Sequence, residues 1–173
     1  VRAQIDQLIQ DLCAFTGKTW DEERFREVMK ISQRNSYLWE RANGLLDHKP
    51  APIGGIELFN YMSAMVCNRG KTSTTAIMEQ LNAEMEENIR LGKSTFPVEE
   101  EFRVSWDGIA CWPYLSHNLR TLKKYGINMV ASSYGKAWAI EYDDLDGMAR
   151  AYCFASTNGD NATTMIGRRL EAL

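Results

Sequence analysis

The stretch FRVSWDGIACWPYLSHNLRTLKKYGINMVASSY, residues 102–134, decides the fold that we expect for this chain. Its residues 102–106 alternate between apolar and polar side chains, which is the pattern of a half-buried strand. Asp107-Gly108 then predicts a tight turn, and Pro113 suits the first turn of a helix. Leucines on one helical face follow, and the apolar residues after Gly126 predict a second strand. Strand, helix and strand in this order form a βαβ unit with parallel strands.

The residues before this unit predict a block of helices. Apolar residues recur at three- and four-residue spacing in residues 1–15, 19–48, 56–67 and 72–91. We expect Thr19 and Thr72 to cap the second and fourth of these helices. The polar run Ser32–Ser36 predicts one exposed turn within the second helix.

The pattern predicts two domains. Residues 93–101 are polar and contain a proline, and the apolar period changes from 3.6 to 2 after them. We expect a helical domain at 1–95 and a partial α/β domain at 96–173, with its βαβ core at 102–134. The fold class is therefore α/β and helix-rich: a helical block followed by the start of a doubly wound parallel sheet.

The C-terminal part predicts less regular structure. We expect a loop at 135–142, helices at 143–154 and 162–173, and a turn between them at 156–161. Two strands do not make a stable sheet, since at least three with a covered face are usually needed. We therefore expect further strands from a longer chain, of which this one would be a part, or from a partner.

Composition excludes several classes of function. The chain has 173 residues, of which 45% are hydrophobic and 25% charged, as in a globular domain. A net charge of −3 and a pI near 5.5 argue against a nucleic-acid surface. No window approaches the roughly 20 apolar residues of a membrane span, and no signal peptide is recognisable. We expect a protein of the reducing cytoplasm with no membrane partner.

Cysteine and histidine spacing predicts no metal site. Cys13, Cys67, Cys111 and Cys153 contain no C-x-x-C pair, and the two histidines have no ligand-like spacing to them. Three of the cysteines, Cys13, Cys67 and Cys153, lie on or beside apolar helical faces, so we expect them in the core. Cys111, near a helix start, is either a reactive thiol or iron ligand, or a small apolar side chain in the turn.

Two loops carry the candidate binding chemistry. The carboxyl ends of parallel strands are where ligands bind in such sheets, and here the loops are 107–112 and 132–138. N–H groups at the helix start suit a carbonyl oxygen, a carboxylate or a phosphate. The simpler alternatives are a plain structural turn and a solvated loop anchored by its tryptophan. The residues expected to line a substrate cleft are Trp106, Asp107, Gly108, Ile109, Cys111, Trp112, Ser132, Ser133, Tyr134 and Trp138, and the pattern assigns no catalytic residue.

Several short strings carry a resemblance to a known family. They are RVSWDGIACWP at 103–113, then residues 119–126, 131–134 and 137–138, with 12–26, 49–52 and Phe59 upstream. Together they resemble the 2-hydroxyacyl-CoA dehydratase D-component family, which includes benzoyl-CoA reductase-like subunits. The resemblance spans most of the chain.

The resemblance implies a function and partners. It implies an anaerobic lyase that removes water from (R)-2-hydroxyacyl-CoA thioesters through a ketyl radical, made by the injection of one electron. It also implies a heterodimer of related subunits, each with a [4Fe-4S] cluster, and a separate ATP-dependent activator protein. Family members are longer, with two α/β domains and a helical insertion. This chain would correspond to the helical part and the beginning of the second α/β domain.

The resemblance places no cluster ligand on this chain. The cluster cysteines of the family lie in an earlier domain and in a later strand-end turn, and neither has a counterpart here. We therefore expect no metal on this chain alone, an isolated chain without activity, and a cleft position for Cys111. Two alternatives stay open: a subunit of the benzoyl-CoA reductase type, and a non-catalytic helical module for assembly or docking.

Overall fold

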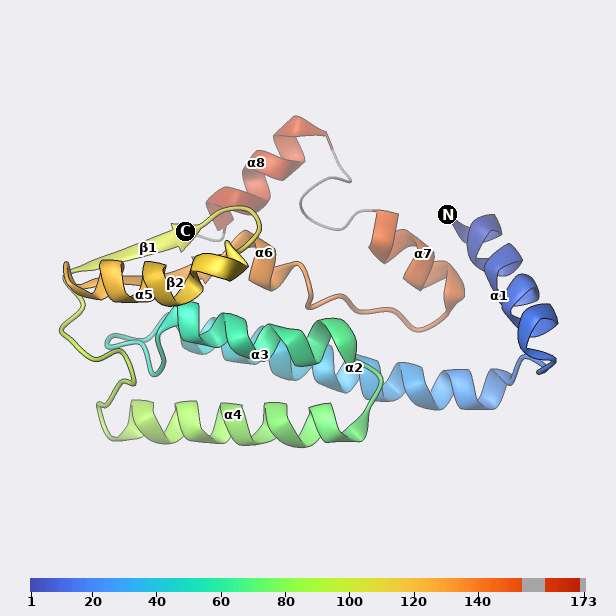
Figure 1. Ribbon diagram of the computed structural model, residues 1–173, viewed down its shortest axis with the longest axis horizontal. Coiled ribbons are helices and arrows are strands. Elements are labelled where there is room, and N and C mark those ends of the chain that lie inside the picture. Colours follow the sequence, from blue (N-terminus) through green and yellow to red (C-terminus); the bar gives the residue numbers. More distant parts are fainter. Residues whose placement is uncertain (154–160, 172–173) are drawn as a thin grey trace.

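The computed structural model describes residues 1–153 and 161–171 and has the expected helix-rich α/β architecture (Figure 1). Four long helices precede a short parallel sheet, and shorter helices surround and follow it. The turn expected from residue 156 lies largely outside the described residues. The elements are α1 (Arg2–Thr16), α2 (Glu22–Leu45), α3 (Gly55–Cys67), α4 (Thr72–Arg90), β1 (Phe102–Trp106), the 3-10 turn η1 (Trp112–Tyr114), α5 (Leu115–Lys123), β2 (Ile127–Ser132), α6 (Ser133–Lys136), α7 (Leu145–Cys153) and α8 (Ala162–Glu171).

The two expected helix caps were wrong. Helix α2 begins after Asp21, whose carboxylate accepts a hydrogen bond of 2.8 Å from the N–H of Arg24, so Thr19 lies outside the helix. The negative charge of an aspartate at this position also interacts favourably with the positive end of the helix dipole. In α4 the residue before the helix is Lys71, and Thr72 is already helical.

The main core lies between α2, α3 and α4. Trp39 and Ala42 of α2 are fully buried, and the helices α2 and α4 run alongside each other in Figure 1. Part of the second half of the chain packs against the same core, including Val130 of β2 and the side chains of Tyr134 and Trp138. The division into domains at residue 95 stays a prediction, although the two halves share this core.

The polar run Ser32–Ser36 is not the exposed turn that the sequence suggested. Ser32, Asn35 and Ser36 are buried, the last two completely. Partners distant in sequence cover them: the guanidinium of Arg69 contacts Ser32, and the carbonyl of Ile140 accepts from Ser36. Polar side chains are stable inside a protein when such hydrogen bonds replace water.

The parallel pairing of β1 and β2 confirms the predicted βαβ unit. Phe102 pairs with Ile127 and Trp106 with Ser132, with one irregularity between Val104 and Ser105. Helix α3 approaches β2 so closely that a Cβ on Gly55 would come within 1.6 Å of the carbonyl oxygen of Met129. This contact requires glycine at the start of α3.

A buried carboxylate joins the sheet to the helices. Glu100 is 7% exposed and accepts hydrogen bonds from the Asn128 side chain at 2.6 Å and from the N–H of Ala51 at 3.2 Å. It also pairs with Arg103 at 2.8 Å, and Arg103 donates to the carbonyl of Leu46 at 2.7 Å. The connection between α2 and α3, the linker and both strands therefore meet at one side chain.

The cysteines are less buried than expected. Cys67 and Cys153 are exposed and Cys13 is half-buried, so the core position was wrong for the first two and only partly right for the third. Helix α1 explains the exposure around Cys13, because it contacts mainly α7 and has no fully buried residue. Within the described residues, no helix is both long and apolar enough to cross a membrane.

Candidate functional site

The structure brings the two candidate loops together at the carboxyl end of the sheet. The hydroxyl of Ser133 donates a hydrogen bond of 2.5 Å to the carboxylate of Asp107. Ser132, the last residue of β2, is buried, and its hydroxyl accepts from the N–H of Gly135 at 3.1 Å. The first loop is thus tied to the second at the point where both strands end.

The second loop is more regular than the solvated loop considered from the sequence. It begins with the short helix α6, and Trp39 of α2 donates from its indole N–H to the carbonyl of Gly135 at 2.8 Å. A Cβ on Gly135 would come within 3.3 Å of the amide oxygen of Asn43. Residue 135 of α6 therefore packs against α2, and a side chain there would be crowded.

The aromatic residues of the first loop pack on the helical block. The rings of Trp106 and Trp112 lie 6.5 Å and 6.3 Å from the ring of Phe59 in α3. Trp112 remains 43% exposed, and Ile109 in the same loop is 69% exposed. The apolar spacing of the helix at 56–67 predicts an inward-facing Phe59, but it gave no sign that this ring would support the loop.

The aromatic residues of the second loop pack elsewhere. Tyr134 and Trp138 lie edge to face at 6.2 Å and belong to the core of α2, α3 and α4. The indole N–H of Trp138 is buried and has no hydrogen-bond partner among the described residues. The four aromatic side chains at this sheet end therefore form two pairs on different clusters.

The backbone donors at the start of the helix are mostly in use. The N–H groups of Trp112 and Tyr114 donate to the carbonyls of Ala110 and Cys111 at 2.9 Å and 2.8 Å. The N–H of Leu115 donates to Trp112, and Pro113 has none. Donors without a described partner are those of residues 109–111, in the turn that follows Gly108, whose φ of 87° suits glycine. The N–H groups without a described partner thus precede the helix.

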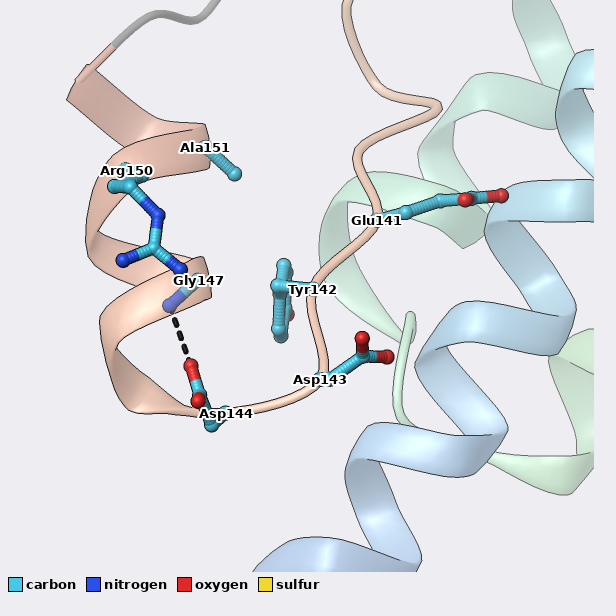
Figure 2. A pocket seen from close by; sticks show the side chains of 7 residues that line it. All are labelled: Glu141, Tyr142, Asp143, Asp144, Gly147, Arg150 and Ala151. Atoms are coloured by element: carbon cyan, nitrogen blue, oxygen red, sulfur yellow. Dashed lines mark hydrogen bonds between the residues drawn. The ribbon is translucent and has the colours of Figure 1, made fainter.

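Three hollows of the described surface are lined in part by residues 141–146, and none of these three is lined by a residue of the two loops. One, of about 440 Å³, is lined by the segment before α7 and by α7 itself (Figure 2). Asp144 accepts from the N–H of Gly147 at 2.6 Å, and Arg150 lies on the same side of α7. The ring of Tyr142 lies 6.4 Å from that of Tyr152, whose pKa is raised by burial. Sequence reasoning did not identify this hollow.

Potential metal ligands do not gather in the described part of the chain. No three side chains of histidine, cysteine, aspartate or glutamate come close enough there to hold a metal ion. Cys111 is exposed in the first loop, without another cysteine paired to it. The expectation that this chain alone holds no cluster stays a prediction.

Comparisons with known proteins support the resemblance. A family model described as 2-hydroxyglutaryl-CoA dehydratase, D-component, matches residues 1–173. The chain is 44% identical to the (R)-2-hydroxyisocaproyl-CoA dehydratase alpha subunit of Clostridioides difficile, over 100% of this chain and 43% of that protein. It is 45% identical to the (R)-phenyllactyl-CoA dehydratase alpha subunit of Clostridium sporogenes, over 88% of this chain and 37% of that protein.

A more distant relative extends the same pattern. The alpha subunit of (R)-2-hydroxyglutaryl-CoA dehydratase from Acidaminococcus fermentans is 34% identical over 90% of this chain and 32% of its own length. The chain thus spans less than half the length of these curated relatives. Because the family match covers every residue, the chain belongs to the 2-hydroxyglutaryl-CoA dehydratase D-component family.

Proposed function

We propose that this chain forms part of an alpha-type subunit of an enzyme that removes water from an (R)-2-hydroxyacyl-CoA thioester. The observation that carries the proposal is the similarity to alpha subunits of three such dehydratases, at 34% to 45% identity. The acyl groups in the names of these relatives differ in size and polarity. They share the 2-hydroxyacyl thioester, so the proposal names this substrate class and no particular acyl group.

We assign thioester binding to the joined loops at the sheet end. One-electron reduction of the substrate would place negative charge on the thioester oxygen, giving a ketyl radical. N–H donors oriented toward that oxygen stabilise the charge as it develops. The N–H groups of residues 109–111 have no hydrogen-bond partner among the described residues, and the bond between Ser133 and Asp107 holds the turn that carries them.

Exclusion of water is the second role of this region. A radical anion is protected when its site closes against solvent. Trp112 is supported by Phe59 yet keeps 43% of its surface exposed, so it can cover a bound thioester without unpacking. Loss of its indole should therefore affect substrate binding more than folding.

The electron and its carrier belong to other parts of the assembly. Dehydration is redox-neutral, so an electron that enters the substrate must leave again before the product is released. We propose an ATP-dependent activator protein as its source and a related subunit as the partner. We propose that the [4Fe-4S] cluster that the resemblance implies is held mostly by regions outside this chain.

The test uses the full-length protein with its partner subunit and activator under anaerobic conditions. We expect conversion of (R)-2-hydroxyisocaproyl-CoA or a related thioester to the enoyl-CoA. Trp112→Ala should raise KM at least tenfold, while Tyr125→Ala, which removes an exposed aromatic side chain beyond α5, should change little.

Other outcomes would point to the alternatives. Unchanged kinetics of Trp112→Ala would remove the loop assignment. Reduction of benzoyl-CoA without water loss from any 2-hydroxyacyl-CoA would favour a reductase. A colourless protein without either activity would favour a docking module, which the exposed apolar side chains Leu8, Leu12 and Phe15 of α1 would suit.

A further inference from the structure

The side chain of Arg69 occupies an unusual place beneath the second loop. It follows α3, is half-buried, and forms no salt bridge with any acidic side chain of the described residues. Burial lowers its pKa, because desolvation penalises the charged guanidinium. Its charge is met by neutral oxygens, which are dipoles with fixed positions.

The guanidinium of Arg69 holds two carbonyls of one segment. One terminal nitrogen donates to the carbonyl of Trp138 and the other to that of Ile140, both at 2.8 Å. The Nε–H donates to the hydroxyl of Ser32 at 2.8 Å, and a terminal nitrogen also contacts the hydroxyl of Ser36. The group therefore connects α2 to the chain just after α6.

Side chains of α2 continue this pattern on both sides of Arg69. The indole of Trp39 donates to the carbonyl of Gly135 at 2.8 Å, and the amide of Gln33 donates to that of Tyr142 at 2.6 Å. Ser36 donates to the carbonyl of Ile140 at 2.7 Å. Residues three apart lie on one side of a helix, so these donors form a row. We call residues 135–142 the docked segment.

The geometry of a guanidinium explains why this position holds arginine. Its planar fork can reach two carbonyls and a hydroxyl at once, whereas a lysine presents a compact charge on a flexible stem. Burying the charge costs solvation free energy, so the gain in global stability is small. The fixed positions of the two carbonyls are the larger effect.

We propose that Arg69 is a positioning residue that fixes α6, and with it Ser133 opposite Asp107, through the docked segment. Helix α6 spans only residues 133–136, and the N–H of Ala137 bonds back to the carbonyl of Ser133 at 3.2 Å. Release of the carbonyl of Trp138 would therefore loosen the whole turn. The consequence for thioester binding rests on the proposed function; the consequence for the loop does not.

The loop is tested first by hydrogen exchange in the full-length assembly. We compare Arg69→Lys and Arg69→Gln with Arg90→Gln, which removes an exposed arginine paired with Glu87. Both Arg69 variants should speed exchange at least tenfold in a peptide covering 133–142 and leave a peptide covering 78–88 of α4 unchanged. Unchanged exchange at 133–142 in both variants would overturn the proposal, and so would equal acceleration in both peptides, because it would indicate general destabilisation.

The kinetics test the link to function. A misplaced binding group can reduce kcat/KM by about 100-fold. We expect Arg69→Lys to lower kcat/KM at least tenfold, mainly through a higher KM. The measurement is made well below the melting temperature of the variant. Faster exchange at 133–142 without any kinetic change would support the structural role of Arg69 in positioning the loop. It would contradict the role of the loop in thioester binding. We do not expect Arg69→Lys to retain the kcat/KM of the parent protein, because the planar fork of arginine and not its charge positions the carbonyls. Parent-like kcat/KM in Arg69→Lys would overturn this mechanism.

Discussion

Ser133 and Asp107, 26 residues apart in the sequence, are joined by a hydrogen bond of 2.5 Å between the hydroxyl and the carboxylate. The bond connects the turn after β1 to the first residue of α6. Since each residue directly follows the end of a strand, the sheet itself brings them together. The hydrogen bond joins the two loops into one structural unit.

Removing this bond should affect function more than stability. Ser133→Ala should lower kcat/KM for the thioester about tenfold, because the turn that holds the donors of residues 109–111 would lose its tie. The free energy of unfolding should fall by only about 1 kcal/mol, as for one exposed hydrogen bond. Urea titration and steady-state kinetics measure both. Ser116→Ala on the exposed side of α5 is the control, and equal kinetics of the two variants would contradict the prediction.

The contact of α3 with β2 predicts a strong requirement for glycine. Gly55→Ala should lower the free energy of unfolding by about 3 kcal/mol or more, because its Cβ would overlap the carbonyl of Met129. Gly44→Ala is the matched control in α2, where a Cβ meets nothing within 4 Å. That change should stabilise by about 0.5–1 kcal/mol through helix propensity. If Gly55→Ala lowered the free energy of unfolding by less than about 1 kcal/mol, the close contact between α3 and β2 would be wrong.

The raised pKa of Tyr152 predicts a loss of stability at high pH. Tyr152 keeps 48% of its surface exposed, but its partial burial favours the neutral phenol in the folded protein, so the unfolded chain releases this proton first as the pH rises. The contribution of Tyr152 to the free energy of unfolding is full below the pKa of the phenol in the unfolded chain, which is near 10. It disappears as the pH rises through the higher pKa of the folded protein. In urea unfolding between pH 8 and 11, Tyr152→Phe should lose less stability than the parent protein. Identical pH profiles would refute the shift.

Thiol reactivity tests the positions of the cysteines. Cys67, Cys111 and Cys153 are exposed and should react rapidly with a thiol reagent in the folded protein, whereas the half-buried Cys13 should react more slowly. Labelling followed by mass spectrometry of peptides gives each rate. Slow labelling of Cys67 would indicate that the end of α3 is covered in the assembly.

The sequence predicted regular elements well because their signals are local. The alternation in residues 102–106, the spacing of leucines before Gly126 and the periodic helices all survive in the structure. The family and the location of the two loops at one sheet end were also predictable. Whether the ten loop residues contact a substrate stays a prediction.

The failures concern interactions between distant parts of the chain. Ser32 and Ser36 resembled a solvated turn because their partners, Arg69 and the carbonyl of Ile140, lie 33 or more residues away in sequence. The docked segment has the expected irregular structure after Lys136, but its contacts with Arg69 and α2 could not be predicted from local sequence. The apolar surroundings of Cys67 likewise suggested burial, although it is exposed among the described residues.

The shared carboxylate of Glu100 limits how the site can open. Because it ties the linker to Asn128 of β2 and to Arg103 of β1, and Arg103 in turn to the end of α2, the sheet cannot swing away from the helices as a hinged lid without breaking this buried set. Entry of a thioester would then depend on local motion of the two loops, while the sheet and the helices keep their relative positions.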